Sequence, residues 1–184
     1  MGDVFGRYIS GISGDYLFHS VPYYSMSEED LELEEFNKLG EQASQGCVRL
    51  AVSDAKWVYD NCPTGTNVSI YDDAENAGPL GRPDAIKITD FTNKWDPTDS
   101  NKKCPYAKAT PTISGANDYT IKSGGEFYAL AGVTAVDTCG NDITSNIEVF
   151  GNVITTRKGK YKVTYSVTDV LKRTSSVTIT VTVQ

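Results

Sequence analysis

Several features are scarce in this 184-residue sequence. It has a single histidine, His19, and no run of apolar residues long enough to cross a bilayer; no signal peptide follows Met1. Acidic residues outnumber basic ones by 24 to 17, and the net charge of −7 argues against nucleic acid or an anionic membrane as a partner. Four cysteines allow three complete pairings, and the sequence cannot choose among them.

One of the four cysteines stands in an unusual setting. Residues 44–50 read Ser-Gln-Gly-Cys-Val-Arg-Leu, so that Gly46 directly precedes Cys47. A glycine here lets the backbone turn tightly and aim N–H groups at the group that the sulfur attacks. A thiol also needs a nearby base, and His19 has no competing histidine. We predict a Cys–His pair; the alternatives are a small buried cysteine and a histidine satisfied in the core.

The first half of the chain shows a mixture of strand and helix signals. Glycines separate short apolar runs, which predict strands at residues 6–9 and 14–19, with His19 at the end of the second. Ser27, followed by three acids, predicts the start of a helix, and Ser53 is expected to cap a second helix that runs to about Asn61.

The segments that follow the second expected helix are less regular. Short strands are expected at residues 66–71 and 85–88, with an irregular stretch rich in Gly and Pro between them. Residues 96–108 are polar, contain two prolines and are interpreted as a linker. If Cys47 is a free nucleophile, a disulfide between Cys104 and Cys139 is one possibility.

From about Ala109 onward, the pattern becomes that of an all-β domain. Residues 160–167 and 176–183 alternate strictly between polar and apolar side chains, as expected of strands with one buried face. Several such segments within about 75 residues predict a small β-sandwich.

The first half resembles the YkuD-type catalytic domain of L,D-transpeptidases, enzymes of the bacterial cell wall. The resemblance covers roughly residues 1–90 and depends on His19-Ser20, on the motif at residues 44–49 and on residues 52–63 with Gly65-Thr66. Gln45 departs from the family pattern, which usually has a second histidine at this position. The implied fold is a mainly β, partial YkuD-like sandwich with one or two helices.

The resemblance implies a two-step acyl transfer through a cysteine thioester that forms 3→3 cross-links between peptidoglycan stem peptides. His19 is the expected base, oriented through the backbone carbonyl of Ser20, and Arg49 would bind a substrate carboxylate or instead brace the loop through an ion pair. The expected site residues are Cys47, His19 and Ser20 for catalysis, Gly46 and Gln45 at the oxyanion, and Arg49, Ser44 and Tyr24 for substrate binding. Tyr24 has packing as its alternative role.

The second half resembles the Ig-like modules of bacterial surface proteins, on the basis of residues 137–142 (Asp-Thr-Cys-Gly-Asn-Asp) and 159–161 (Gly-Lys-Tyr). The expected organisation is therefore a partial catalytic domain at 1–95, a linker at 96–108 and an Ig-like sandwich at 109–184. A rigid spacer is the favoured role of the Ig-like half.

The resemblance also implies how the protein would work in the cell. No metal or organic cofactor is required, carbapenem-type β-lactams are expected inhibitors, and the expected location is the cell wall or surface, with an export signal upstream of this chain. The family's first strands have no counterpart here, so a second copy is expected to complete the sheet. The alternatives are a catalytically incomplete wall-associated remnant and a cysteine peptidase that uses water in place of the amine.

Overall fold

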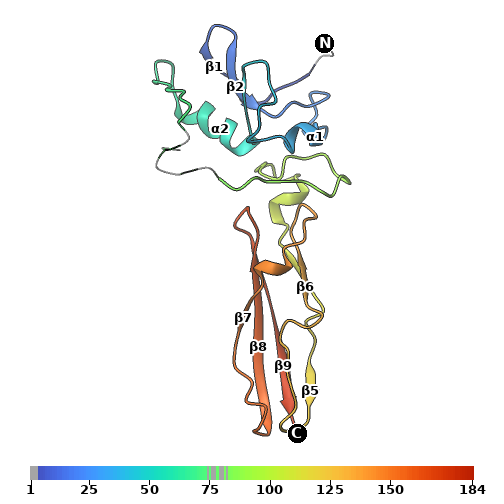
Figure 1. The fold of residues 1–184 in the computed structure, drawn as a ribbon. Helices are drawn as coiled ribbons and strands as arrows, with labels where there is room; N and C mark the ends of the chain where they lie inside the picture. The colour runs from blue at the N-terminus through green and yellow to red at the C-terminus, as the bar shows by residue number, and fades with distance from the viewer. Residues whose placement is uncertain (1–3, 74, 76–77, 79–80, 82) are drawn as a thin grey trace. The chain divides into compact units, whose positions relative to one another are not determined.

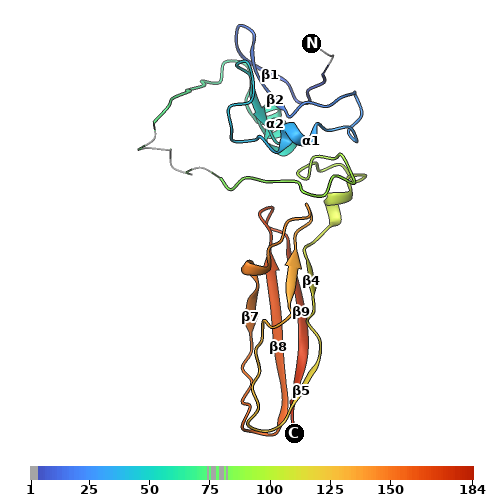
Figure 2. The same ribbon diagram turned by 45° about the vertical axis from the view of Figure 1, so that its right-hand side comes forward.

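The chain folds into two compact units, Met1–Lys108 and Ala109–Gln184 (Figures 1 and 2). The computed structural model describes residues 4–73, 75, 78, 81 and 83–184. The predicted fold class, mainly β with a few helices, is confirmed. Among the described residues, no helix is both long enough and apolar enough to span a membrane.

A three-stranded sheet organises the first unit. β1 (Ser10–Ser13) pairs antiparallel with β2 (Tyr16–Ser20), and β2 pairs parallel with β3 (Val48–Leu50). The strand expected at 6–9 lies instead at 10–13, whereas the expected strand ending near His19 is present. Since a parallel neighbour requires a crossover, residues 21–47 return the chain to the same end of the sheet.

The two α-helices of the first unit are unequal. α2 (Val52–Asn61) matches the expected second helix and packs on β2 and β3, whereas α1 (Leu33–Phe36) is a single turn. The helix expected to start at Ser27 is absent, because the Ser27 hydroxyl accepts the Glu29 N–H at 3.2 Å in a local turn. Glu28, the residue after Ser27, forms an ion pair with Arg7.

The two short strands expected after α2 do not form. Residues 66–71 and 85–88 form no strand pairing. Asn37 takes the place of a neighbouring strand for the buried Ile88: its side-chain amide donates to the Ile88 carbonyl at 2.8 Å and its Oδ1 accepts the Ile88 N–H at 2.7 Å. A side chain thus satisfies backbone groups that the sequence pattern assigned to a sheet.

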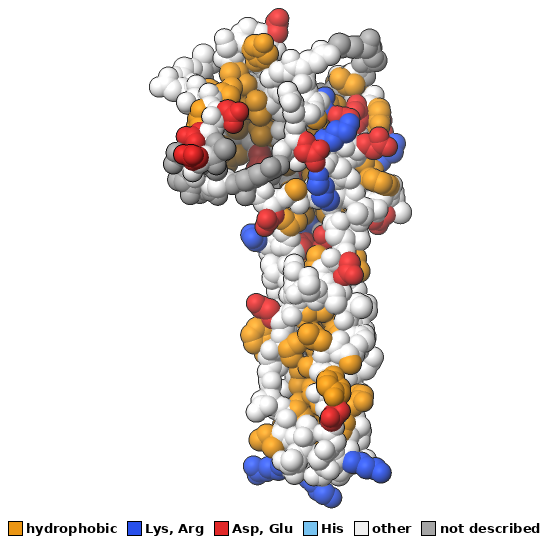
Figure 3. Space-filling view, viewed as in Figure 1, with side chains coloured by type: hydrophobic (Ala, Val, Ile, Leu, Met, Phe, Trp, Pro, Cys, Tyr) orange, Lys and Arg blue, Asp and Glu red, His pale blue; other side chains and the backbone are white. Residues whose placement is uncertain are grey.

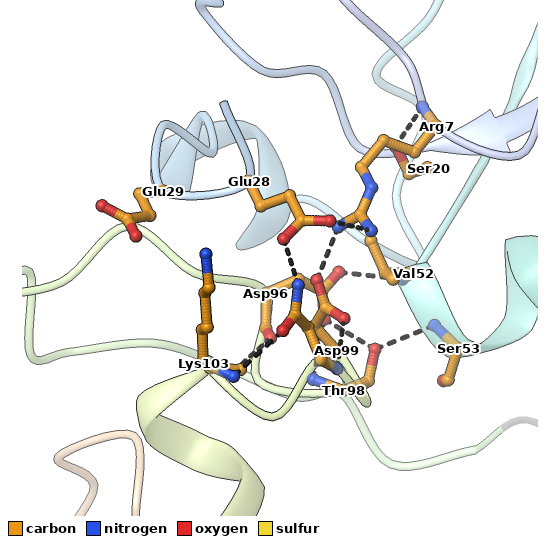
Figure 4. Close-up of polar contacts among 12 residues, drawn as sticks. Arg7, Ser20, Glu28, Glu29, Val52, Ser53, Asp96, Thr98, Asp99 and Lys103 are labelled. Atoms are coloured by element: carbon orange, nitrogen blue, oxygen red, sulfur yellow. Dashed lines mark hydrogen bonds and ion pairs between the residues drawn. The ribbon is translucent and has the colours of Figure 1, made fainter. Parts of the chain in front are cut away.

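The segment expected to be a linker is instead an integral part of the first unit. Asp96 is fully buried, and its Oδ2 accepts the N–H of Val52, the first residue of α2, at 2.8 Å (Figure 4). Thr98 donates to the other Asp96 oxygen at 2.6 Å and accepts the Ser53 N–H at 3.1 Å. Residues 96–98 therefore cap α2, in place of the predicted cap by Ser53.

This cap arises because the helix cannot cap itself. The N-cap residue of α2 is Ala51, which has no side-chain acceptor. Burial raises the pKa of the Asp96 carboxyl, while the hydrogen bonds from Thr98 and Val52 oppose that rise. The carboxylate is thus a buried group that remains acceptable because N–H and O–H donors surround it.

The second unit is a β-sandwich in which most neighbouring strands are antiparallel. Only the pair of β5 and β9, among the described residues of this unit, runs parallel. Its two sheets have the orders β4-β6 and β5-β9-β8-β7. The bounds are β4 Thr112–Ser114, β5 Tyr119–Ile121, β6 Thr134–Val136, β7 Glu148–Phe150, β8 Gly159–Thr168 and β9 Thr174–Val183.

The alternation predicted for the two long strands of the second unit is present. The apolar residues of β8 and β9 form the centre of the core. Tyr165 of β8 is buried and donates from its hydroxyl to the Ala129 carbonyl at 2.7 Å, so its polar end is satisfied inside the sandwich.

Replacing Asp96 tests whether residues 96–98 hold the first unit together. Asp96→Ala removes the acceptors of three hydrogen bonds, and we expect the free energy of unfolding of this unit to fall by about 2 kcal/mol. Both tryptophans, Trp57 and Trp95, belong to the first unit, so urea unfolding followed by tryptophan fluorescence reports on it alone.

The matched control is Asp84→Ala, the same chemical change at an exposed position of the same unit. We expect it to change the unfolding free energy by less than about 0.5 kcal/mol. Equal effects of the two substitutions would contradict the capping role of Asp96.

Candidate active site

His19 lies near the end of β2 with its ring held in one orientation. Its Nδ1 is 2.6 Å from the carbonyl oxygen of the next residue, the fully buried Ser20. A carbonyl oxygen can only accept, so Nδ1 carries the proton, and the neutral ring keeps its lone pair on Nε2. His19 is therefore held as the tautomer that a general base needs.

The backbone of Arg7 holds Ser20 in place. The Arg7 N–H donates to the Ser20 hydroxyl at 2.9 Å, the Ser20 N–H donates to the Arg7 carbonyl at 3.0 Å, and the Ser20 hydroxyl donates to the Val21 carbonyl at 2.8 Å. Every one of these polar groups of Ser20 thus has a partner within the fold. The carbonyl that orients His19 is fixed through them.

The side chain of Arg7 extends this support to distant parts of the first unit (Figure 4). Its guanidinium binds the nearly buried Asp99 at 2.5 Å and Glu28 at 2.9 Å. Burial acts against the charge on Arg7, but the hydrogen bond and negative charge of Asp99 outweigh it, and the pKa of Arg7 is raised. Asp99 lies in the supposed linker, and no sequence spacing pointed to its pairing with Arg7 92 residues away.

Gly6 lies against the His19 ring. A Cβ built on Gly6 would be 3.3 Å from His19 Nδ1, closer than an ordinary van der Waals contact. The backbone before β1 therefore confines the ring on one side. Glycine is suited to this position because a side chain would push the imidazole away from the Ser20 carbonyl.

The loop before Cys47 is held by Ser44 and Gly46. The Ser44 hydroxyl accepts the Gly46 N–H at 3.1 Å and donates to the Cys47 carbonyl at 2.5 Å. Gly46 has a φ of +137°, and a Cβ there would be 2.3 Å from Cε1 of Tyr16, so only glycine fits. Ser44 therefore holds the loop in this conformation. Its hydroxyl also binds the Gly46 N–H, which the family resemblance assigns to binding the oxyanion.

Cys47 opens into a cavity of about 320 Å³. Its thiol is half-buried and lies 3.9 Å from the Asp15 carbonyl, a contact too long and weak to immobilise it. The cavity is lined by residues of α1 and of the loop that leads to β3: Glu35, Lys38, Leu39, Gly40, Glu41, Gln42, Ala43, Ser44, Cys47, Val48 and Arg49. Among the predicted site residues, it brings together Cys47, Ser44 and Arg49.

The pairing of β2 with β3 relates His19 to this cavity. His19 lies opposite Arg49 in the parallel register, and Cys47 immediately precedes β3. The offset between His19 and Cys47 is thus two residues, about 6.6 Å, along the strand and one strand spacing, about 4.8 Å, across it. These offsets place the two backbones about 8 Å apart. His19 is not among the described residues that line the cavity.

Arg49 is already engaged by a partner on α1. Its guanidinium forms an ion pair with Glu35, which also binds Lys38 at 2.5 Å. The hydrogen bond from Lys38 is the main cause that lowers the pKa of the Glu35 carboxyl below its usual range, and the Arg49 guanidinium lowers it further. The Arg49 Nε is buried without a hydrogen-bond partner among the described residues. The ion pair that we considered as the alternative role of Arg49 is therefore present, and Glu35 is a cavity residue that the motif did not include.

Two predicted site residues lie apart from the cavity. Tyr24 is exposed and lines a separate hollow of about 190 Å³ with Phe91 and Lys94, whose ammonium is 5.5 Å from the centre of the Tyr24 ring. Gln45 is exposed on the loop. The structure therefore does not bring Tyr24 together with Cys47.

The remaining cysteines have no arrangement that suggests chemistry. The four cysteines form no disulfide in the part of the chain that the structure describes, and Cys104 and Cys139 are each buried within their own unit. Burial raises the pKa of Cys139 to about 11 and raises that of Cys104 as well, which keeps both protonated. Within the part of the chain that the structure describes, no three His, Cys, Asp or Glu side chains gather as a metal site would require.

Two protein families match the two halves of the chain. Residues 4–70 match the L,D-transpeptidase catalytic domain, YkuD, and residues 111–183 match the Ig-like domain of bacterial surface proteins. The resemblance inferred from the motifs is thus confirmed for both halves. The first match includes His19, Cys47 and Arg49 but ends before Asp96 and Asp99.

Individual relatives cover only parts of the chain. "Putative L,D-transpeptidase YciB" of Bacillus subtilis (strain 168) is 49% identical over 57 residues, 31% of this chain and 28% of YciB. Pesticidal crystal protein Cry22Aa of Bacillus thuringiensis is 42% identical over 66 residues, 33% of this chain and 9% of that protein. The chain thus spans less than a third of the length of either relative.

Solved structures show weaker likeness. A structure of CBM51-2 in complex with GlcNAc and INT domains from Clostridium perfringens ZmpB is 28% identical over 40% of this chain and 16% of that chain, with a TM-score of 0.37. Lipoprotein BT2262 of Bacteroides thetaiotaomicron is 25% identical over 40% of this chain and 37% of its own, with a TM-score of 0.35. Scores of this size do not establish a shared overall fold.

The ion pairs of Glu35 with Lys38 and Arg49 predict a pH-dependent contribution to stability. Because the pKa of Glu35 is lowered, the contribution is present above pH about 4.5 and is lost as the pH falls through the folded-state pKa. Glu35→Gln should therefore lower the unfolding free energy at pH 7 by about 0.5 kcal/mol and have no effect at low pH. Urea unfolding at pH 7 and pH 3, followed by tryptophan fluorescence, measures this difference; equal effects at both pH values would contradict it.

Proposed function

We propose that the first unit is a cysteine acyltransferase of the L,D-transpeptidase type, acting on peptidoglycan stem peptides. The observation that supports this most directly is the 2.6 Å contact between His19 Nδ1 and the Ser20 carbonyl, which leaves Nε2 to accept a proton. The match of residues 4–70 to the L,D-transpeptidase catalytic domain supports the same assignment.

The proposed reaction has two steps. In the first, Nε2 of His19 takes the thiol proton, Cys47 attacks the carbonyl of the third stem residue, and the terminal D-alanine leaves as its amine receives that proton. In the second, a side-chain amine of a neighbouring stem attacks the thioester and gives its proton to His19, and the thiolate of Cys47 is released and reprotonated. The product is a 3→3 cross-link, and neither step needs a metal or an organic cofactor.

The oxyanion would be stabilised by backbone N–H groups at Cys47 and Gln45. The Gly46 N–H is bound by the Ser44 hydroxyl, so in this arrangement Gly46 contributes through its conformation rather than as a donor. Ser44 acts on the substrate site indirectly, by holding the loop.

Arg49 is proposed to bind a carboxylate of the stem peptide after it leaves Glu35. Two observations support this role: the buried Nε of Arg49 has no hydrogen-bond partner among the described residues, and Arg49 lines the cavity into which Cys47 opens. An arginine can bind a carboxylate through two parallel hydrogen bonds, and the substrate would then replace Glu35 as its partner.

A catalytically incomplete remnant with a binding or spacer role is the second candidate. Three observations favour it: Glu35 occupies Arg49, Ser44 occupies the Gly46 N–H, and Tyr24 lies outside the cavity. A hydrolase is a variant of the first candidate, because the acyl-enzyme is shared and only the acceptor differs. Cross-linked dimers among the products would indicate a transferase, and trimmed monomers would indicate a hydrolase.

The proposed location is the bacterial cell wall or surface. The match of residues 111–183 to the Ig-like domain of bacterial surface proteins supports this, as does the wall substrate of the proposed reaction. The Ig-like unit would serve there as a spacer.

Acylation by a carbapenem tests the proposed site. We expect intact-protein mass spectrometry to show one covalent adduct on the wild type, because the strained β-lactam carbonyl takes the place of the substrate carbonyl. Cys47→Ala should abolish the adduct and His19→Gln should slow its formation by at least about 100-fold. Cys62→Ala, which replaces the other half-buried thiol, is the control and should leave the adduct unchanged.

A small alkylating agent separates the two candidate functions. If Cys47 reacts with iodoacetamide but not with the carbapenem, the thiol is accessible while the acyl-transfer site is not assembled. That outcome would reject the transpeptidase and favour the remnant.

We further propose that a second copy pairs along β1, which is an edge strand of the three-stranded sheet. Its neighbour Ile9 is half exposed, and an unprotected edge favours association. Light scattering at tens of micromolar should give about twice the 20.0 kDa chain mass, and Ile9→Lys should restore a monomer. A wild-type monomer at this concentration would contradict the proposal.

A further inference from the structure

Charge is unevenly distributed between the two units. Residues 109–184 carry seven Lys and Arg against six Asp and Glu, which leaves ten of the 17 basic and 18 of the 24 acidic residues in residues 1–108. The first unit therefore carries a net charge of −8 and the second a net charge of +1, which together give the −7 of the whole chain. The negative charge of the whole chain therefore does not exclude an anionic partner for the second unit.

Four of the seven cations of the second unit gather at one end of its sandwich. Lys122 directly follows β5, Arg157 and Lys158 precede β8, and Lys160 is the second residue of β8. We name these four residues the basic tip. Figure 3 shows Lys and Arg side chains at this end of the second unit, where the C-terminus also lies (Figure 1).

Backbone hydrogen bonds hold the segments of the basic tip together. Ser123 donates to the Gln184 carbonyl at 2.8 Å and Gly124 donates to the Thr155 carbonyl at 2.8 Å. The Ser123 hydroxyl also donates to the Thr156 carbonyl at 3.1 Å. The turn after β5 is thus joined both to the end of β9 and to the loop before β8. The four cations are brought together by the fold, although they are up to 38 positions apart in sequence.

All four side chains of the basic tip are exposed. None of the four forms an ion pair with a described residue of its own unit. The two acids nearest to Lys122 in sequence have other partners: Asp118 accepts the Thr180 N–H at 2.7 Å, and Glu126 accepts the Tyr128 hydroxyl at 2.6 Å. The cluster therefore keeps its positive charge available to a ligand.

We infer that the basic tip binds a linear phosphodiester polymer of the alditol phosphate kind. Lysine binds phosphate as a flexible point charge, and several unpaired cations on one surface suit a chain of regularly repeated anions. The turns that carry the cations consist largely of glycine, serine and threonine, so they offer few apolar groups for insertion into a bilayer. The inference does not depend on the catalytic proposal for the first unit.

Fluorescence anisotropy with end-labelled poly(glycerol phosphate), titrated with the full chain, tests this inference. For four phosphate contacts we expect the logarithm of the binding constant to fall with the logarithm of salt concentration with a slope of about −3. The triple variant Lys122→Gln/Lys158→Gln/Lys160→Gln should bind at least about tenfold more weakly at 50 mM salt.

The matched control is Lys102→Gln/Lys103→Gln/Lys108→Gln, which removes the same charge from exposed positions of the first unit. It should bind within about twofold of the wild type. Since all six side chains are exposed, circular dichroism should show both variants folded.

Three outcomes would overturn the inference. They are absence of binding at 50 mM salt, equal loss in the two triple variants, and co-sedimentation with phosphatidylglycerol vesicles without binding to the polymer. The second would mean that only net charge matters, and the third that the partner is a lipid surface.

Discussion

The ion pair between Arg7 and Asp99, with the neighbouring cap from Asp96, is the interaction on which the first unit depends. The guanidinium of Arg7 connects the start of the chain to a segment 92 residues later, while its backbone holds Ser20. Asp96, three residues before Asp99, satisfies the first N–H of α2. One short segment therefore supports both elements that flank the candidate site, β2 with its histidine and α2 after the cysteine loop.

This arrangement has an energetic reason. A partly buried arginine and a buried carboxylate are each costly alone, and they are retained because each satisfies the other. The N-cap residue of α2, Ala51, has no side-chain acceptor, so the first N–H groups of the helix lack a partner within it and bind the carboxylate of Asp96. The polar composition of residues 96–104, which is typical of a linker, thus reflects their pairing with the polar groups of the first unit.

Some groups of the candidate site are available to a substrate, whereas others are bound by neighbouring side chains. His19 is held as the tautomer with a free Nε2, and the half-buried Cys47 opens into a cavity. Arg49 and the Gly46 N–H, by contrast, are bound by Glu35 and Ser44. A substrate carboxylate would have to displace Glu35, so its binding free energy includes the cost of breaking the ion pairs of Glu35. This competition is the physical difference between an active transferase and a remnant.

The two units also differ in net charge. The first unit is acidic and holds ion pairs such as those of Arg7 and Arg49, whereas the second unit has nearly balanced charge, with four of its seven cations at one end. A uniform acidic chain would repel anions at every surface. A chain with segregated charge can keep a cationic surface on one unit, because salt screens the interaction between exposed charges that are more than about 10 Å apart.

Local patterns in the sequence were sufficient for much of the protein. Alternation along β8 and β9, the apolar face of α2 and the motifs around His19 and Cys47 depend on residues within one element, and they predicted both families and the main strands correctly. Tertiary structure alone decided the cap of α2 by Asp96, the pairing of Arg7 with Asp99, the engagement of Arg49 by Glu35 and the separation of Tyr24 from Cys47. It also decided that Ser27 starts no helix and that residues 66–71 and 85–88 form no strands. These features join residues that are far apart in the chain, and whether a polar side chain finds such a partner depends on the fold that surrounds it, which no local spacing records.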